Sequence, residues 1–243
     1  ESVKEFAYTS SIEPPSLRRR GAQTGATPRK FALAATSPAP PAGLVVSAAA
    51  AHLRVMTNWY TADLHFGHDN IIRFCGRPFK DAGQMDATLL QNLWSCVGPP
   101  DDLWIGGDFA FGRRSRDRGW LRSVFDHLPG ARRHFIIGHQ DPEGTLALPW
   151  DSKAQIAEVK DGADGLTHTL CHYPMVTWNR ARRGALQLFG HVHQNWRGTR
   201  NAINVGVDVW DFRPVRIEEI ARRAATQPVN QHWHDAEPRA LLD

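Results

Sequence analysis

The second and longer part of the chain divides into short segments of two kinds. Residues 58–65, 101–108 and 133–137 are short runs rich in apolar residues, and they predict strands. Residues 85–97 and 114–128 carry apolar residues at helical spacing, which predicts helices between those strands. Such an alternation is typical of an α/β layered domain.

The same pattern continues toward the C-terminus. Four more strand-like segments follow, at residues 155–159, 166–171, 185–189 and 202–209. The first two flank a turn rich in Gly and Asp, which is typical of a hairpin. Residues 215–224 predict a closing helix. We therefore expect one globular α/β domain over residues 56–226, followed by a loosely structured polar tail over 227–243.

Residues 1–55 differ in composition from the rest of the chain. They are rich in Ala, Pro, Ser and Arg and show no strand periodicity, which indicates a disordered extension. An organelle transit peptide or non-native sequence ahead of a start at Met56 would have the same composition, and the strand pattern that begins after Met56 favours the last of these. The segment holds seven basic and three acidic residues, which account for the formal net charge of +4. The sequence pI therefore says little about nucleic acid binding.

Cysteine usage and hydropathy predict a cytoplasmic protein without a membrane partner. Cys75, Cys96 and Cys171 lie far apart and form no Cys-x-x-Cys pair, which suits a reducing compartment, and we expect all three to be buried thiols. No apolar run approaches the roughly 20 residues of a membrane span.

Residues of the types that bind metals, Asp and His, fall at the ends of the predicted strands. Asp63 and His65 are two positions apart, so an extended backbone would direct both to one face. Because α/β sheets build sites where strands end, we expect these side chains to converge. The predicted metal ligands are Asp63, His65, Asp108, His139, His172, His191 and His193.

Five motifs at these predicted strand ends, taken in their order along the chain, resemble those of a known protein family. They read YTADLHFGHDNII from Tyr60, GD at 107–108, GHQD at 138–141, His172, and GHVH at 190–193. This series is similar, from about residue 56 to 219, to calcineurin-like metallophosphoesterases of the small bacterial and phage type. The resemblance implies a four-layer metallophosphoesterase sandwich, in which two mixed β-sheets are flanked by helices.

The resemblance also implies a dinuclear metal centre. Asp63, His65, Asp108 and His193 would hold one divalent ion, and Asp108 would bridge to a second that is completed by His172, His191 and the third motif. Such a centre hydrolyses a phosphomonoester or phosphodiester by attack of a metal-bridging hydroxide. The expected substrate is a phosphorylated small molecule or a nucleotide.

The third motif departs from the family pattern, which has Asn and His where this chain has His139 and Gln140. An imidazole ligand shifts the preference toward Zn²⁺ or Fe over Mn²⁺. Gln140 can hydrogen-bond a leaving oxygen but cannot protonate it, so poor leaving groups should react slowly. Either His139 or His68 takes over proton donation, or the substrate has an acidic leaving group. The same substitutions also suit a domain that binds a phosphorylated ligand without turnover.

Several other residues carry weaker predictions. Arg182 and Arg183 are candidates for substrate binding, and Trp178 could stack on a base. The Arg-rich segment 113–118 is interpreted as a solvated surface, although it leaves open a nuclease-like role on single strands. We expect Asp208 to cap a turn.

Overall fold

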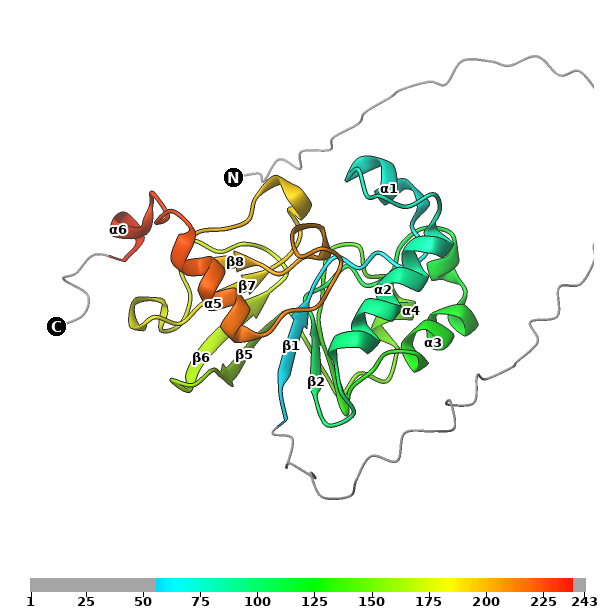
Figure 1. Cartoon of the computed structure of the whole chain (residues 1–243), viewed down its shortest axis with the longest axis horizontal. Coiled ribbons are helices and arrows are strands. Elements are labelled where there is room, and N and C mark those ends of the chain that lie inside the picture. Colours follow the sequence, from blue (N-terminus) through cyan, green and yellow to red (C-terminus); the bar gives the residue numbers. More distant parts are fainter. Residues whose placement is uncertain (1–55, 238–243) are drawn as a thin grey trace, which may run out of the picture. The chain divides into compact units, whose positions relative to one another are not determined.

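The computed structural model describes residues 56–237, which form two four-stranded sheets flanked by helices (Figure 1). This arrangement confirms the predicted α/β class. The interpretation of residues 1–55 as an extension lies outside the described residues, as does the end of the predicted tail, 238–243.

The first sheet has the order β1-β2-β3-β4 and is entirely parallel, so the prediction that both sheets are mixed was wrong for this sheet. Its strands are β1 (Asn58–Thr61), β2 (Asp102–Ile105), β3 (Arg132–Ile136) and β4 (Ser152–Ala154). The first two end several residues earlier than predicted, because Asp63 and Asp108 leave the extended conformation. The sequence of β4, Ser-Lys-Ala, carries no apolar pattern, so it was not predicted.

Helices α1 (Asp69–Phe74), α2 (Ala82–Cys96), α3 (Arg118–Asp126) and α4 (Glu143–Leu146) lie in this half of the protein. The prediction of one helix over 114–128 was wrong: a 3₁₀ turn, η1 (Arg114–Arg116), precedes α3. The break is at Asp117, whose carboxylate accepts hydrogen bonds from the backbone N–H groups of Gly119 and Trp120 and caps α3.

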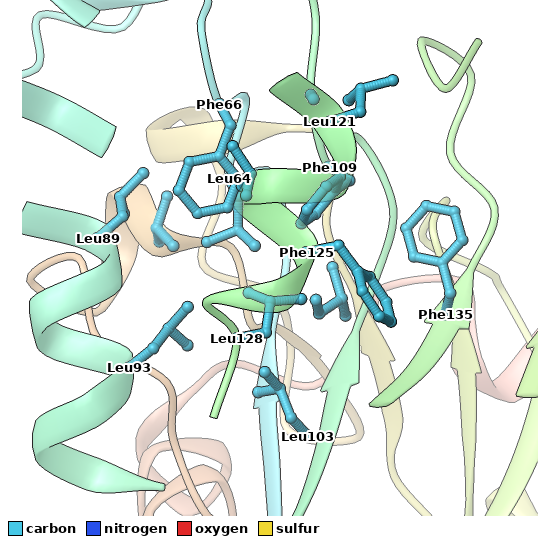
Figure 2. Close-up of a cluster of buried hydrophobic side chains, with 14 of the residues drawn as sticks. Leu64, Phe66, Leu89, Leu93, Leu103, Phe109, Leu121, Phe125, Leu128 and Phe135 are labelled. Atoms are coloured by element: carbon cyan, nitrogen blue, oxygen red, sulfur yellow. The ribbon is translucent and has the colours of Figure 1, made fainter. Parts of the chain in front are cut away.

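The apolar faces of α2 and α3 pack on the first sheet. Leu89 and Leu93 of α2 and Phe125 of α3 belong to one cluster of buried side chains with Leu103 and Phe135 of the sheet (Figure 2). Full burial of such side chains stabilises the fold by about 1.5–3 kcal/mol each. This core holds the strands whose ends carry the predicted ligands.

The second sheet has the order β5-β6-β7-β8. Its strands are β5 (Ile156–Asp161), β6 (Leu166–Cys171), β7 (Gln187–Phe189) and β8 (Ala202–Asn204). The first two form the predicted antiparallel hairpin, and the others pair in parallel. The predicted strand 202–209 is too long, because the chain turns after Asn204 into the 3₁₀ helix η4 (Val207–Val209).

A second core lies between the two sheets. Tyr60 and Ile136 of the first sheet pack with Leu188 and Ile203 of the second, and helix α5 (Ile217–Thr226) adds Ile220. Helix α5 confirms the predicted closing helix. Figure 1 shows α5 beside the second sheet and α2, α3 and α4 beside the first.

The outer face of the second sheet is covered by the segment around the 3₁₀ turn η2 (Ala181–Arg183). Trp178 belongs there to a buried cluster that includes Phe189, is 8% exposed, and donates its Nε1–H to the carbonyl of Ala185. The idea that Trp178 stacks on a base is therefore wrong. The tail also contains a helical turn, α6 (Trp233–Ala236), where a loose segment was predicted.

An isolated parallel bridge between Ala62 and Gly206 joins the end of β1 to the chain that leaves β8. The strand ends of both sheets consequently meet at one place. The three cysteines are free and half-buried rather than fully buried as predicted. Within residues 56–237, no helix is both long enough and apolar enough to span a bilayer.

Candidate metal centre

The predicted ligands gather where the parallel strands of both sheets end. Asp63 and His65 follow β1, Asp108 follows β2, and His139 follows β3. The second sheet contributes His172 directly after β6, and His191 and His193 after β7. Within each of three overlapping groups, the ligand atoms lie within 4.8 Å of one another. The groups are Asp63–His65–His193, Asp63–Asp108–His172 and His139–His172–His191.

Five of these residues have a left-handed backbone conformation. The φ angles are 56° for Asp63, 53° for His65, 51° for Asp108, 69° for His191 and 50° for His193. Non-glycine residues adopt this conformation at a cost of about 1–3 kcal/mol each when the surrounding structure enforces it. Backbone strain concentrated at predicted ligands indicates that the fold maintains their positions for a purpose other than stability.

The first group lacks internal partners for two buried ligand atoms. The Oδ1 atom of Asp63 accepts a hydrogen bond of 3.0 Å from the backbone N–H of His191, whereas its Oδ2 atom has no partner within the described residues. The Nε2 atom of His65 is likewise buried without a partner there. Buried polar atoms are costly when unsatisfied, and a cation between them would satisfy both.

The group His139–His172–His191 is oriented by the protein backbone. The Nδ1–H of His172 donates to the carbonyl of Gly106 over 2.9 Å, which leaves the lone pair on Nε2. That Nε2 atom lies 3.1 Å from Nδ1 of His139. Two nitrogen ligands each about 2.1 Å from one ion have a similar separation. The Nδ1 atom of His191 is buried and has no partner in the described part of the chain.

Asp108 lies between the group Asp63–His65–His193 and the group His139–His172–His191. Its Oδ2 atom is 3.6 Å from Nε2 of His65 and 3.3 Å from Nδ1 of His139, and its Oδ1 atom is 3.6 Å from Nε2 of His172. The backbone N–H of Gln140 donates to Oδ1 over 3.0 Å. This single carboxylate can therefore contact ions on both sides.

Burial and neighbouring charges shift the pKa of several ligands, and the shifts of three imidazoles suit a cation. Burial raises the pKa of the Asp63 carboxyl to about 7, so its charged form needs a positive neighbour. Burial lowers the pKa of His65, His172 and His191, and these neutral imidazoles keep a lone pair for a metal. Burial also lowers the pKa of His193, but hydrogen bonds with Asp208 and Cys75 and the charge of Asp63 raise it to about 10.

A buried ion pair supports the first group. Both oxygens of Asp208 accept from the Arg77 guanidinium, over 2.7 and 2.9 Å, and Oδ2 also lies 2.8 Å from Nδ1 of His193. Arg77 further donates to the carbonyls of Asp63 and Leu64. The prediction that Asp208 caps a turn was wrong, because it orients a predicted ligand. Arg77 was missed, since 131 residues separate it from Asp208 and no local pattern connects them.

The third motif positions Asp108. The carboxylate of Asp141 accepts hydrogen bonds of 2.7 to 2.9 Å from the backbone N–H groups of Gly138, Asp108 and Phe109. Burial raises the pKa of Asp141 to about 6, against the effect of these donors. A Cβ atom on Gly138 would lie 2.5 Å from the backbone nitrogen of Asp108, so only glycine fits there. Gly138 and Asp141 therefore hold Asp108 in position.

Other predicted site residues lie at the edge of the cluster or away from it. The Nδ1 atom of His68 is 3.3 Å from Nδ1 of His65, and its ring contacts Phe111 at a centroid distance of 4.8 Å. The side chain of His139 is 36% exposed. Arg182 is paired with Glu237 at 3.7 Å and Arg183 is exposed. Within residues 56–237, no ion pair or hydrogen bond joins either arginine to a predicted ligand.

The fold and the site together define an α/β protein of two four-stranded sheets that carries His and Asp groups able to bind metal at the shared strand ends. No protein-family profile matches the sequence. The chain is 30% identical to the Gene 66 protein of Mycobacterium phage D29 over 184 residues, which cover 63% of this chain and 88% of the phage protein. The chain belongs to the same family as that phage protein.

Two further similarities extend this relationship. The chain is 28% identical to the uncharacterized protein MJ1445 of Methanocaldococcus jannaschii over 66% of its own length and 87% of that protein. The crystal structure of AQ665 from Aquifex aeolicus, a protein of unknown function, is similar with a TM-score of 0.55 and 25% identity. That similarity covers 70% of this chain and all of AQ665. These similarities support the fold and assign no activity.

Proposed function

We propose that this protein is a metal-dependent phosphoesterase with the four-layer metallophosphoesterase fold, and that it hydrolyses a phosphomonoester or phosphodiester. The observation that supports this most directly is the position of Asp108. Its carboxylate lies within 3.6 Å of His65 in one group of ligands and of His139 and His172 in the other, and Oδ2 has no hydrogen-bond partner among the described residues. A carboxylate in this position is what two neighbouring cations require.

The residues present fit such a pair of ions. Asp63, His65 and His193 would hold one, His139, His172 and His191 would hold the other, and Asp108 would contact both. When bound, two divalent cations acidify a shared water and neutralise phosphoryl oxygens. The share of imidazole among the ligands favours Zn²⁺ or Fe over Mn²⁺.

The residues that could transfer protons lie at the edge of the predicted metal centre. Gln140 occupies the third-motif position of the acid and cannot donate a proton. His68 contacts His65 and is mostly buried, and burial lowers its pKa, so it is a poor acid near neutral pH. His139 is more exposed and is the imidazole better placed to exchange a proton with a substrate or solvent.

The same Gln140 favours a second candidate function, a domain that binds a phosphorylated ligand without turnover. Metal analysis of the purified protein, combined with turnover of an aryl phosphate and its diester, separates the two functions. Bound metal with hydrolysis supports the phosphoesterase, whereas the absence of both supports the binding domain.

A series of aryl phosphates of increasing leaving-group pKa tests the role of Gln140. We expect the rate of the natural protein to fall steeply along the series, because no acid protonates the leaving oxygen. Gln140→His should flatten this dependence. A shallow dependence that Gln140→His leaves unchanged would show that acid catalysis is intact.

A further inference from the structure

A cavity of about 440 Å³ opens beside the predicted metal centre. Phe111, Gln140 and Pro142 line it together with the turn that carries Arg113 and Arg116. Two contacts place it next to the ligands: the backbone N–H of Gln140 donates to Asp108, and the ring of Phe111 packs on His68. The cavity has the volume of roughly fifteen waters, so it can take much more than a single phosphate.

Arg113 and Arg116 supply positive charge there without a carboxylate partner. Both side chains are exposed, and no ion pair or side-chain hydrogen bond of either is present in the described part of the chain. The nearest acidic residue in sequence, Asp117, is occupied by the cap of α3. Arg114 is different, because its charge acts on the buried Asp86.

The turn that carries the two arginines is anchored. Ser115 is buried, and its hydroxyl donates to the carbonyl of Gly112 over 2.9 Å. Gly112 in turn lies against His68, since a Cβ atom built on it would be 3.8 Å from the Cα atom of His68. The backbone from which both arginine side chains extend is therefore held in place beside the predicted metal centre. This reduces the conformational entropy that is lost when the side chains bind an anion.

We propose that Arg113 and Arg116 bind the leaving phosphate of a phosphoric anhydride, so that the substrate carries a P–O–P linkage. This inference rests on the proposed function of the same site. It explains Gln140 and the arginines together: a departing phosphate has a second pKa of about 6 and needs no proton, whereas an alkoxide does. Two cationic side chains stabilise its developing charge instead.

The reaction balances without a general acid. An oxygen from water forms a bond to one phosphorus, and the bond from that phosphorus to the bridging oxygen breaks. The bridging oxygen keeps the electron pair and leaves as part of a phosphate anion beside Arg113 and Arg116. The proton lost by the water passes to solvent.

Calorimetric titration of zinc-saturated protein with imidodiphosphate, a P–N–P analogue that resists hydrolysis, tests the site without relying on turnover. The double variant Arg113→Ala/Arg116→Ala should lose tenfold or more in affinity for imidodiphosphate, because charged hydrogen bonds are removed. Its affinity for orthophosphate should change less than twofold. Arg118→Ala, which removes one such charge from an exposed position of the neighbouring helix, should change neither affinity more than twofold.

Equal losses for imidodiphosphate and orthophosphate, or equal losses in the Arg118→Ala control, would overturn the assignment. So would a protein that hydrolyses p-nitrophenyl phosphate yet cleaves pyrophosphate and ADP no faster than glycerol phosphate. If the protein hydrolyses none of these compounds but the double variant shows the selective loss of imidodiphosphate binding, the anhydride-binding site is supported. The proposed phosphoesterase activity is then refuted. Thermal unfolding of each variant confirms that it is folded.

Discussion

Replacing Asp208 by Asn should destabilise the protein and weaken metal binding at the same time. The side chains of Asp208 and Arg77 are 3% and 0% exposed, and the pair is bidentate. Asn keeps the shape of Asp but leaves the buried guanidinium without a countercharge. Breaking a buried pair in this way costs about 3–5 kcal/mol, and Arg77 retains two backbone carbonyl partners, so we expect about 3 kcal/mol.

The same substitution removes the charged acceptor that orients His193. Asp208 lies 2.8 Å from Nδ1 of that ring, and partners of this kind are typically worth 10–100-fold in metal affinity. Urea unfolding in the presence of a chelator, followed by tryptophan fluorescence, measures the stability of the metal-free form. Zinc titration against a chromophoric chelator measures the affinity.

The surface pair Arg122–Asp126 provides a matched control. Its Nε–Oδ1 distance is 2.7 Å, the same as in Arg77–Asp208, but its side chains are 58% and 49% exposed. Asp126→Asn should therefore cost less than about 0.5 kcal/mol and leave zinc affinity unchanged. If both variants lost equal stability, or if Asp208→Asn kept full zinc affinity, the argument from burial and ring orientation would be refuted.

Three further predictions concern metal, pH and backbone. Zinc at 100 times its dissociation constant should stabilise the chelator-treated protein by about 2.7 kcal/mol, measured as a rise in Tm that disappears when excess chelator is added. Burial raises the folded pKa of Asp86 from 3.8 to about 6, so its contribution to stability is present below pH 4 and lost as pH rises through 6. Asp86→Asn should therefore lower the unfolding free energy at pH 4.5 by about 2 kcal/mol more than it does at pH 7.5. An equal effect of the substitution at the two pH values, measured in chelator-treated protein, would contradict this. Gly107→Ala should lower zinc affinity, because the new Cβ atom would lie 2.5 Å from Nδ1 of His172. Gly76→Ala, also at positive φ but with nothing within 4 Å, should cost only about 1 kcal/mol of strain in urea unfolding and leave zinc affinity intact.

Most of the fold could be predicted from the sequence because its elements follow local rules. The period of apolar residues located α2, α5 and the β5–β6 hairpin. The failures came where local periodicity and three-dimensional constraints disagree. The apolar spacing within residues 114–128 begins only at Trp120, and the polar residues before it gave no sign that the carboxylate of Asp117 caps α3 and separates it from η1. The run 202–209 alternates apolar residues with Asn204, Gly206 and Asp208, as a strand would, yet its second half turns and orients Asp208 toward His193.

The predicted ligands follow a similar division. Asp63, His65, Asp108, His172, His191 and His193 were identifiable because each follows a strand-like run, and parallel strands of one sheet end at one edge. That the two sheets present their ligands to the same place depends on the bridge between Ala62 and Gly206, which no local pattern encodes. The prediction that these residues bind two metals stays a prediction that the metal analysis will test.

The sequence by itself determined which residues can act as ligands and at which strand ends they fall, because strand periodicity and residue chemistry are local properties. Only the tertiary structure decided that Arg77 and Asp208 orient His193, that Trp178 belongs to the core, and that Arg113 and Arg116 border a cavity beside Gln140. Those relations depend on the packing of segments far apart in the chain, and the sequence carries no short-range signal for them.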